Sequence, residues 1–252
     1  MPLKKRSPIH QPSLRTLDLP PPYRLVTLRE VGDAFEHACA NAVELGAGAL
    51  VFVGRFDLAE FAVVLEPDEP LASARRAFYA GMLALCDALA ATAPPEKPIA
   101  IEWPDAIHVD RGLIGGGRLG WPERGDEQAA PDWLVFGAAI RTAFMSGEEA
   151  GLHPTATALD EEGFGDFRSE HLAAGFARHL MVAIDRWQAD GFDPIAKDYL
   201  SRLTAGQGAR GDIDENGDLE IRRLGRPVER RSLLPALKSP SWLDAKTGGP
   251  RL

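Results

Sequence analysis

The sequence lacks any long uninterrupted hydrophobic run. Its most apolar stretch, Ala77 to Ala91, is broken by Asp87 and is shorter than the roughly 18 residues that a membrane-crossing helix needs. The N-terminus carries Lys4, Lys5 and Arg6, but prolines follow them where a secretory signal has an apolar core. We therefore exclude a transmembrane protein and predict no secretory signal.

Cysteine and positive charge are also scarce. The two cysteines, Cys39 and Cys86, lie in Ala-rich helical patterns with no CxxC and no His/Cys cluster, so the sequence predicts neither a disulfide framework nor a metal site. The net charge of −9 argues against a basic surface that would bind nucleic acid. We expect a cytoplasmic protein without nucleic-acid or membrane partners, and the sequence leaves its oligomeric state open.

What is present is the composition of a folded protein. Of the 252 residues, 45% are hydrophobic and 26% are charged, which is typical of a soluble globular chain with a sizeable core. We predict four parts: an extended arm at 1–22, a main domain at 23–204, a small β domain at 205–237 and a tail at 238–252.

Hydrophobic periodicity predicts a mixture of strands and helices. Alternating or strongly apolar runs predict strands at 23–29, 49–56, 61–65, 99–103, 107–109, 112–120 and 133–144. Helical spacing predicts helices at 33–45, 70–91, 169–190 and 194–203, the first with Asp33 as its N-cap. After a linker at 204–208, residues 211–237 alternate like short strands, and residues 239–252 trail off with proline and glycine.

An acidic run in the small β domain begins like an EF-hand calcium loop. Asp212, Asp214 and Asp218 have the right spacing, but Arg223 stands at the twelfth position, where a bidentate glutamate belongs. We interpret the run as a hairpin turn at Asn216-Gly217 and predict no calcium site.

Three segments, in order, carry a family resemblance. Residues 102–117, EWPDAIHVDRGLIGGG, are similar to the K-W-P-N-D…R-K-[LI]-[AG]-G segment of biotin protein ligases. Residues 134–141, LVFGAAIR, resemble that family's V-V-G-I-G-I-N strand, and residues 156–163, ATALDEEG, resemble its A-T-S-L-x-E-E-G segment. On these motifs the chain is identified as a member of the biotin/lipoate protein ligase superfamily, over roughly residues 23–237.

The resemblance implies both a fold and a function. The implied fold is α+β: a mixed, largely antiparallel sheet with helices mainly on one face, plus a small SH3-like C-terminal module. The implied activity is binding of a carboxylic acyl group (biotin, lipoate or octanoate) and its transfer to a lysine of a carrier protein. The implied partners are a small carboxylic acid or acyl thioester and a biotinyl or lipoyl carrier domain, and the implied cofactors of the adenylation step are ATP and Mg.

The sequence departs from the family where cations are expected. In the register through Arg111-Gly112-Leu113, Gly112 takes the place of the family's lysine, and the main domain contains only Lys97 and Lys197. Adenylation brings two anions together, so a fixed cation is needed between them. Because the family's G-R-G-R-x-G-R loop also has no counterpart at 53–57, these changes argue against ATP-driven adenylation.

Arginines from other strands are the remaining candidate cations. Arg118 lies six residues beyond Gly112, about 20 Å along a regular strand, which is too far, and Arg111 points to the opposite face. Arg141 and Arg55 therefore stay as candidate catalytic residues. The alternative is that both are ordinary ion-paired arginines.

The glycine run Gly115-Gly116-Gly117 predicts that a ligand or another part of the chain lies close to the sheet. A strand glycine often marks a place where a ligand or another backbone comes near, because no Cβ intervenes. We expect an acyl chain to lie on this open shelf, and a β-bulge or a tight helix contact is the alternative. With the matching motif positions, the predicted substrate-binding residues are Trp103, Asp105, His108, Gly112, Gly115, Gly116, Gly117, Gly137 and Ala139.

Two further hypotheses remain open from the sequence. Lipoyl and octanoyl transferases of the same superfamily use a thioester donor and a cysteine nucleophile, but Cys39 and Cys86 have the spacing of packing residues. The other hypothesis is a catalytically degenerate member that binds a small acyl ligand or a carrier domain without catalysis. The sequence leaves open whether the protein is an enzyme.

Overall fold

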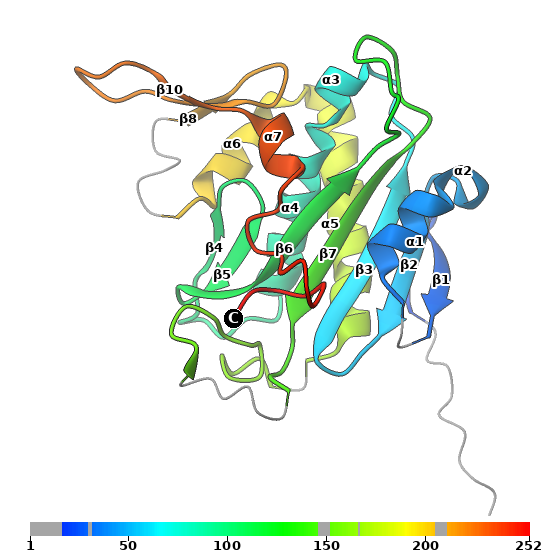
Figure 1. The fold of residues 1–252 in the computed structure, drawn as a ribbon, viewed down its shortest axis with the longest axis vertical. Helices are drawn as coiled ribbons and strands as arrows, with labels where there is room; N and C mark the ends of the chain where they lie inside the picture. The colour runs from blue at the N-terminus through cyan, green and yellow to red at the C-terminus, as the bar shows by residue number, and fades with distance from the viewer. Residues whose placement is uncertain (1–16, 30–31, 146–151, 166, 205–210) are drawn as a thin grey trace, which may run out of the picture.

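A seven-stranded sheet organises the part of the chain that the structure, a computed structural model, describes: residues 17–29, 32–145, 152–165, 167–204 and 211–252. The strand order is β1-β2-β3-β7-β6-β5-β4 (Figure 1). Only the β1–β2 pairing is parallel, so the predicted mixed, largely antiparallel sheet is confirmed. The strands are β1 (Arg24–Leu28), β2 (Ala49–Gly54), β3 (Leu58–Leu65), β4 (Ile99–Glu102), β5 (Ala106–Val109), β6 (Gly112–Gly120) and β7 (Leu134–Arg141).

Two of the predicted helices are each divided into two. The pattern at 33–45 forms α1 (Ala34–Ala40) and α2 (Ala42–Leu45), and the pattern at 70–91 forms α3 (Leu71–Ala74) and α4 (Ala77–Ala90). The long helix α5 (Ser169–Asp190) and the shorter α6 (Asp193–Ser201) lie where they were predicted. Asp33 caps α1 as expected, because its Oδ1 accepts hydrogen bonds from the backbone N–H groups of Phe35 and Glu36.

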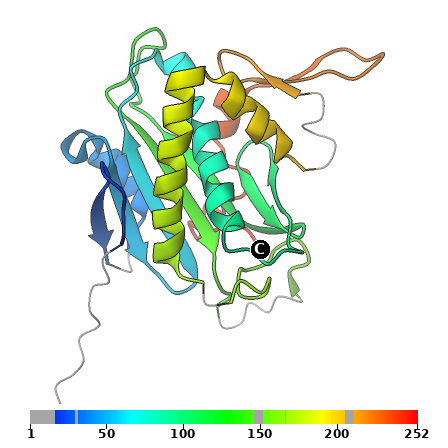
Figure 2. The ribbon, with the colours of Figure 1, turned by 180° about the vertical axis from the view of Figure 1, so that it is seen from behind.

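One face of the sheet packs against α4 and α5 (Figure 2). Its core is aromatic: the ring of Phe136 on β7 stacks on that of Phe176 on α5 with centroids 5.4 Å apart, and Phe61 on β3 contacts Phe176 at 4.9 Å. All three side chains are fully buried. This layer is the main hydrophobic core.

Two different segments cover the opposite face. Helix α1 packs Ala34 and Ala38 against β2 and β3, and the C-terminal segment, residues 239–252, crosses β6 and β7 (Figure 1, red). The expectation that these last residues trail off is wrong, because Trp242 is 0% exposed and packs against the sheet. Proline and glycine indicated correctly that these residues form no regular helix or strand, but they gave no information on the contact between Trp242 and the sheet.

The small β module consists of β8 (Gly211–Ile213), β9 (Leu219–Ile221) and β10 (Glu229–Arg231), followed by helix α7 (Leu233–Leu237). The sequence missed α7, which lies in the stretch predicted to alternate like strands. Ile213, Leu219 and Leu233 join the main core, and Tyr79 Oη on α4 donates a hydrogen bond to the carbonyl of Gly217. The division of the chain into separate domains stays a prediction, and most of the predicted linker, 205–208, lies outside the described residues.

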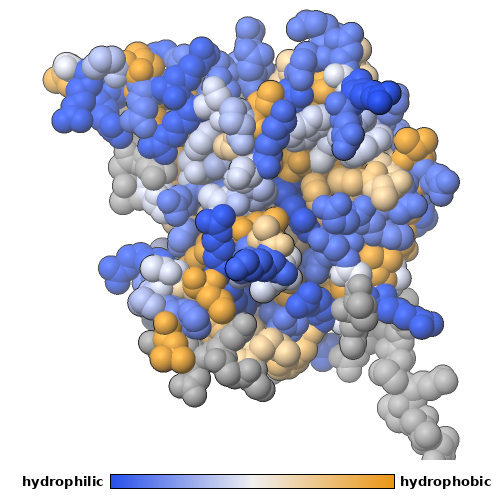
Figure 3. Space-filling view, in the orientation of Figure 1, coloured by the Kyte–Doolittle hydropathy of each residue, from blue (hydrophilic) through white to orange (hydrophobic). Residues whose placement is uncertain are grey.

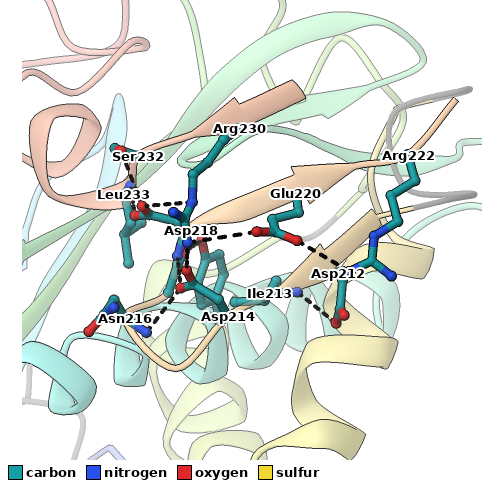
Figure 4. A network of polar contacts seen from close by, with 12 residues as sticks. Asp212, Ile213, Asp214, Asn216, Asp218, Glu220, Arg222, Arg230, Ser232 and Leu233 are labelled. Atoms are coloured by element: carbon teal, nitrogen blue, oxygen red, sulfur yellow. Dashed lines mark hydrogen bonds and ion pairs between the residues drawn. The ribbon is translucent and has the colours of Figure 1, made fainter. Parts of the chain in front are cut away.

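The acidic run of this module is bound internally (Figure 4). Arg230 pairs with Asp214, Asp218 and Glu220, while Asp214 Oδ1 accepts hydrogen bonds from the N–H groups of Asn216 and Asp218. Gly217, at φ +86°, completes the turn. These contacts account for the spacing that resembled a calcium loop.

None of the helices in the described ranges combines the length and apolar character needed to cross a bilayer.

Candidate functional site

The three segments that carry the family resemblance meet in space. Residues 102–117 contain the last residue of β4, all of β5 and the first part of β6, and residues 134–141 form β7, which pairs with β6. The third segment joins both, because Thr157 N donates to Leu113 O at 3.0 Å and Leu159 N donates to Arg141 O at 3.1 Å. The fold therefore assembles a single region from segments that are distant in sequence.

A row of small residues runs across this region on the face opposite α4 and α5. Register pairs Glu60 on β3 with Ala139 on β7, Ala139 with Gly116 on β6, and Gly116 with Ala106 on β5. Directly paired residues share one face of a sheet. We call Ala106, Gly116 and Ala139 the shelf, since only hydrogen or methyl side chains form its surface.

The side chain of Trp242 fills the shelf. Its indole Nε1 donates a 2.9 Å hydrogen bond to the carbonyl of Gly117, and it packs in one cluster with Ala106 and Ala139. A Cβ on Gly116 would lie only 2.4 Å from the ring and 2.0 Å from the carbonyl oxygen of Asp105. Gly116 is thus the position at which a missing side chain lets a flat ring lie on the strand.

The other two glycines of the run serve different contacts. A Cβ on Gly117 would lie 2.6 Å from the sulfur of Met82, on the helix side of the sheet, and one on Gly115, at φ +146°, would lie 2.0 Å from the carbonyl oxygen of Ala139. Gly137 faces Phe35 of α1, 2.6 Å from where its Cβ would be. Of the glycines named as substrate-binding residues, the structure places only Gly116 on the shelf.

Asp105 and Arg141 attach the C-terminal segment to the shelf. Asp105, 1% exposed, accepts hydrogen bonds from Ser241 Oγ at 2.6 Å and Ser241 N at 2.8 Å. Burial raises the pKa of Asp105 to about 6, although the two Ser241 hydrogen bonds act in the opposite direction. Arg141 Nη2 donates to the carbonyl oxygens of Pro250 at 2.6 Å and Arg251 at 3.0 Å.

Gly112, the residue that the motif resemblance aligns with a lysine of the family, is closely packed. A Cβ on Gly112 would lie 2.5 Å from Thr157 Cγ2, so the Thr157 side chain fills this position. Lys97 lies in the turn before β4, and its Nζ pairs with Glu162 at 2.7 Å and with Asp110 of the β5–β6 turn at 3.2 Å. Close packing against Thr157 thus leaves no room for a longer side chain at Gly112.

An open pocket of about 710 Å³ lies beside the β2–β3 turn. Arg55, Asp57 and Glu60 line it, with Asp33 at the start of α1 and Thr247–Gly248 of the C-terminal segment. Arg55 Nη2 pairs with Asp57 Oδ2 at 2.8 Å, and this hydrogen bonding raises the pKa of the guanidinium. Among the described residues, the wall of the pocket thus has three carboxylates and one guanidinium.

Two of the carboxylates at this pocket have buried partners. Glu60, 5% exposed, accepts a 2.7 Å hydrogen bond from the N–H of Ala34, and burial raises its pKa. Arg118 Nη2 pairs with Asp33 at 2.8 Å, and its guanidinium lies 4.4 Å from the centre of the Phe35 ring. Sequence reasoning did not select Glu60, Asp33 or Arg118 as site residues. Arg118 could have been selected from the sequence, because residues two apart in a strand share one face, and Arg118 follows Gly116 by two positions on β6.

Trp103 and His108 lie apart from the shelf contacts. The Trp103 side chain packs against the main core on the helix side, and its Nε1 lies 3.4 Å from Tyr79 Oη. His108 Nε2 lies 3.2 Å from Glu102 Oε2, and its Nδ1 lies 3.2 Å from the carbonyl oxygen of Arg111.

Both cysteines are poor nucleophiles. Burial raises the pKa of Cys39 and of Cys86 to about 12, and the carboxylate of Glu36 adds to the effect at Cys39. The thiolate is the reactive form of cysteine, so neither side chain is activated at neutral pH. The environment of both residues disfavours a cysteine-dependent transferase.

Comparison with known proteins identifies the family. Residues 19–201 match the model of the Biotin/lipoate A/B protein ligase family. The chain belongs to this family. A search of the curated proteins found no match for it.

Solved structures share the fold. A biotin protein ligase-like protein of unknown function from Silicibacter sp. TM1040 is 27% identical, with a TM-score of 0.74 over 88% of this chain and 99% of that chain. The biotin protein ligase of Aquifex aeolicus is 14% identical, with a TM-score of 0.64 over 83% and 99% of the two chains. That of Leishmania major, in complex with biotinyl-5-AMP, is 16% identical, with a TM-score of 0.55 over 84% and 99%.

Proposed function

We propose that this family member binds a small carboxylic acid (biotin, lipoate or octanoate) on the shelf and does not convert it to an acyl-adenylate. The observation that carries the proposal is that the shelf formed by Ala106, Gly116 and Ala139 accommodates a flat ring directly against the strand. Related structures of the Aquifex aeolicus ligase contain biotin, or biotin with ATP. Transfer of the acyl group to a carrier lysine stays a prediction.

The charges around the site argue against the adenylation step. Forming an acyl-adenylate requires a carboxylate and a phosphate to approach, and a preorganised cation has to offset their repulsion. Gly112 and Thr157 provide no such cation, and Asp33, Asp57 and Glu60 place negative charge around the pocket. With three carboxylates beside the guanidinium of Arg55, the described residues of the pocket do not favour binding of a triphosphate.

Two arginines flank the shelf and could bind the carboxylate of the acid. Arg141 lies two residues beyond Ala139 on β7, about 7 Å along the strand and on the same face. Arg55 lies in the adjoining pocket, with one third of its side chain exposed. An arginine binds a carboxylate through two parallel hydrogen bonds, which fixes the orientation of the ligand.

Binding and exchange measurements test the proposal. Isothermal titration and thermal melting with biotin, lipoate, octanoate and ATP should show binding of at least one acid, no response to ATP and no acid-dependent exchange of pyrophosphate into ATP. A ligand at 100 times its Kd should add about 2.7 kcal/mol to the free energy of unfolding. Acid-dependent exchange, or no response to any acid in either the native chain or the Trp242→Ala variant, would contradict the proposal.

A matched pair of substitutions examines the pocket. Arg55→Ala removes the guanidinium beside the shelf and should weaken acid binding several-fold. Arg186→Ala removes an arginine that also pairs with an aspartate, Asp198, but on the exposed surface of α5, and should leave acid binding unchanged. Equal effects of the two substitutions would exclude a specific role for Arg55.

A further inference from the structure

We propose that the C-terminal segment, residues 239–252, is an intramolecular stand-in for the ligand, so that an acid occupies the shelf only after Trp242 has left it. The inference rests on the proposed function. Its first support is steric, because Trp242 is fully buried on the shelf and even a Cβ at Gly116 would lie 2.4 Å from its ring. A ligand and the indole cannot occupy the same surface.

The polar contacts of the segment have the form of ligand contacts. The indole N–H donates to the carbonyl of Gly117, which is how a ring nitrogen of a bound molecule would be held. Arg141 Nη2 donates to two carbonyl oxygens, of Pro250 and Arg251. Both oxygens bond to one nitrogen of the guanidinium, so Arg141 presents an oxygen-binding edge that a ligand carboxylate, held through two nitrogens, would take over. The segment therefore presents a flat ring and an oxygen pair, as an acid with a ring would.

The segment also forms a unit with its own internal hydrogen bonds. It closes on itself through hydrogen bonds from Asp244 N to Gly249 O at 2.9 Å and from Gly248 N to Asp244 O at 2.8 Å. Residues 245–248 are exposed, and no strand of the seven-stranded sheet belongs to the segment. Its departure would leave the sheet intact.

Release of the segment would join the pocket to the shelf. Thr247 and Gly248 form part of the pocket wall, and Trp242 of the same segment covers the adjoining shelf. Figure 3 shows the face on which the segment lies, where hydrophobic side chains form separate patches rather than one continuous surface. The C-terminal segment thus covers the shelf in this conformation. The observed affinity for an acid equals the intrinsic affinity multiplied by the fraction of molecules in which the segment has left.

Hydrogen exchange on the full chain tests the competition directly. Adding biotin, lipoate or octanoate should increase amide exchange in the 239–252 peptide and decrease it in β6. A segment with a purely structural role would be unaffected or protected. Binding of an acid without increased exchange in 239–252 would overturn this inference and leave the proposed function standing.

A matched pair of serine variants gives a second test. Ser241→Ala removes the Oγ hydrogen bond to Asp105 and should tighten acid binding about fivefold while lowering stability, because the covered conformation is weakened. Ser239→Ala, an exposed serine of the same segment, should change neither. Weaker or unchanged acid binding in Ser241→Ala would overturn the inference.

Arg141 separates anchoring of the segment from binding of the ligand. If Arg141 only anchored the segment, Arg141→Lys would tighten acid binding as Ser241→Ala does. We expect binding to weaken at least tenfold instead, because lysine does not reproduce the paired hydrogen bonds to a carboxylate. Tighter binding in Arg141→Lys would refute the carboxylate role of Arg141.

Removing the Trp242 side chain tests the inference even if no acid binds the native chain. The Trp242→Ala variant should then bind at least one of the three acids. Failure of a folded Trp242→Ala protein to bind any acid would refute both this inference and the proposed function.

Discussion

The two faces of the sheet are built by different rules. The face under α4 and α5 is filled with aromatic rings such as Phe61 and Phe136, and it forms the main core. The opposite face, under the C-terminal segment, combines glycine and alanine with buried charged groups, including Asp105 and Arg141. Burying a charged group costs free energy unless it is fully hydrogen-bonded. The helix face therefore provides stability, whereas the other face keeps polar groups in place at some cost in stability.

The difference predicts where stability resides. Phe136→Ala should reduce the free energy of unfolding by about 3–5 kcal/mol, because a buried ring that stacks on Phe176 is lost and a cavity remains. Phe56→Ala, a ring 82% exposed on the β2–β3 turn, should change it by less than about 0.5 kcal/mol. Urea unfolding of both variants measures the contrast. Similar losses in the two variants would show that the core assignment is wrong.

The buried carboxylate on the other face predicts a pH dependence. The folded-state pKa of Asp105 lies at about 6, above the ordinary value of 3.8, so the folded chain binds more protons than the unfolded chain between these values. Its contribution to stability is therefore full below pH 4 and is lost as the pH rises through 6, with a total on the order of 3 kcal/mol.

Asp105→Asn removes this titration. The stability of the variant relative to the native chain should increase as the pH rises from 4 to 7, in paired urea unfolding experiments at each pH. A difference that stays constant over this range would contradict the raised pKa of Asp105.

The shelf predicts a smaller effect. Gly116→Ala would place a methyl group against the Trp242 ring and the Asp105 carbonyl, and should cost about 1–3 kcal/mol while increasing amide exchange in residues 239–252. Gly54→Ala, with only one atom of Phe52 at 4.0 Å from its Cβ position, should be near neutral. Phe136→Ala should not selectively increase amide exchange in residues 239–252. Selective exchange in Gly116→Ala alone would show that only the shelf side of the sheet controls this segment.

Local sequence patterns predicted most of the elements. Alternation and apolar runs located the strands of the large sheet, and helical spacing located α5 and α6 within one or two residues. Asp33 was predicted as an N-cap because capping depends on neighbours two and three residues away. The ordered motifs identified the family, which the match over residues 19–201 confirms.

The contacts within the site were harder to predict from the sequence. The sequence indicated a surface without side chains near Gly116, but it could not show that Trp242, 126 residues further along the chain, would lie on it. Nor could it pair Asp105 with Ser241 or Arg118 with Asp33, which are 136 and 85 residues apart.

The sequence by itself determined the family and most of the strands and helices in their order, and it predicted that no lysine stands at the motif position of Gly112. Only the tertiary structure decided what covers the shelf, which glycine faces it and which groups hold the C-terminal segment. Periodicity and capping are encoded by residues a few positions apart, so they can be read locally. A contact between chain ends depends on how the whole sheet brings them together, and no local pattern records it.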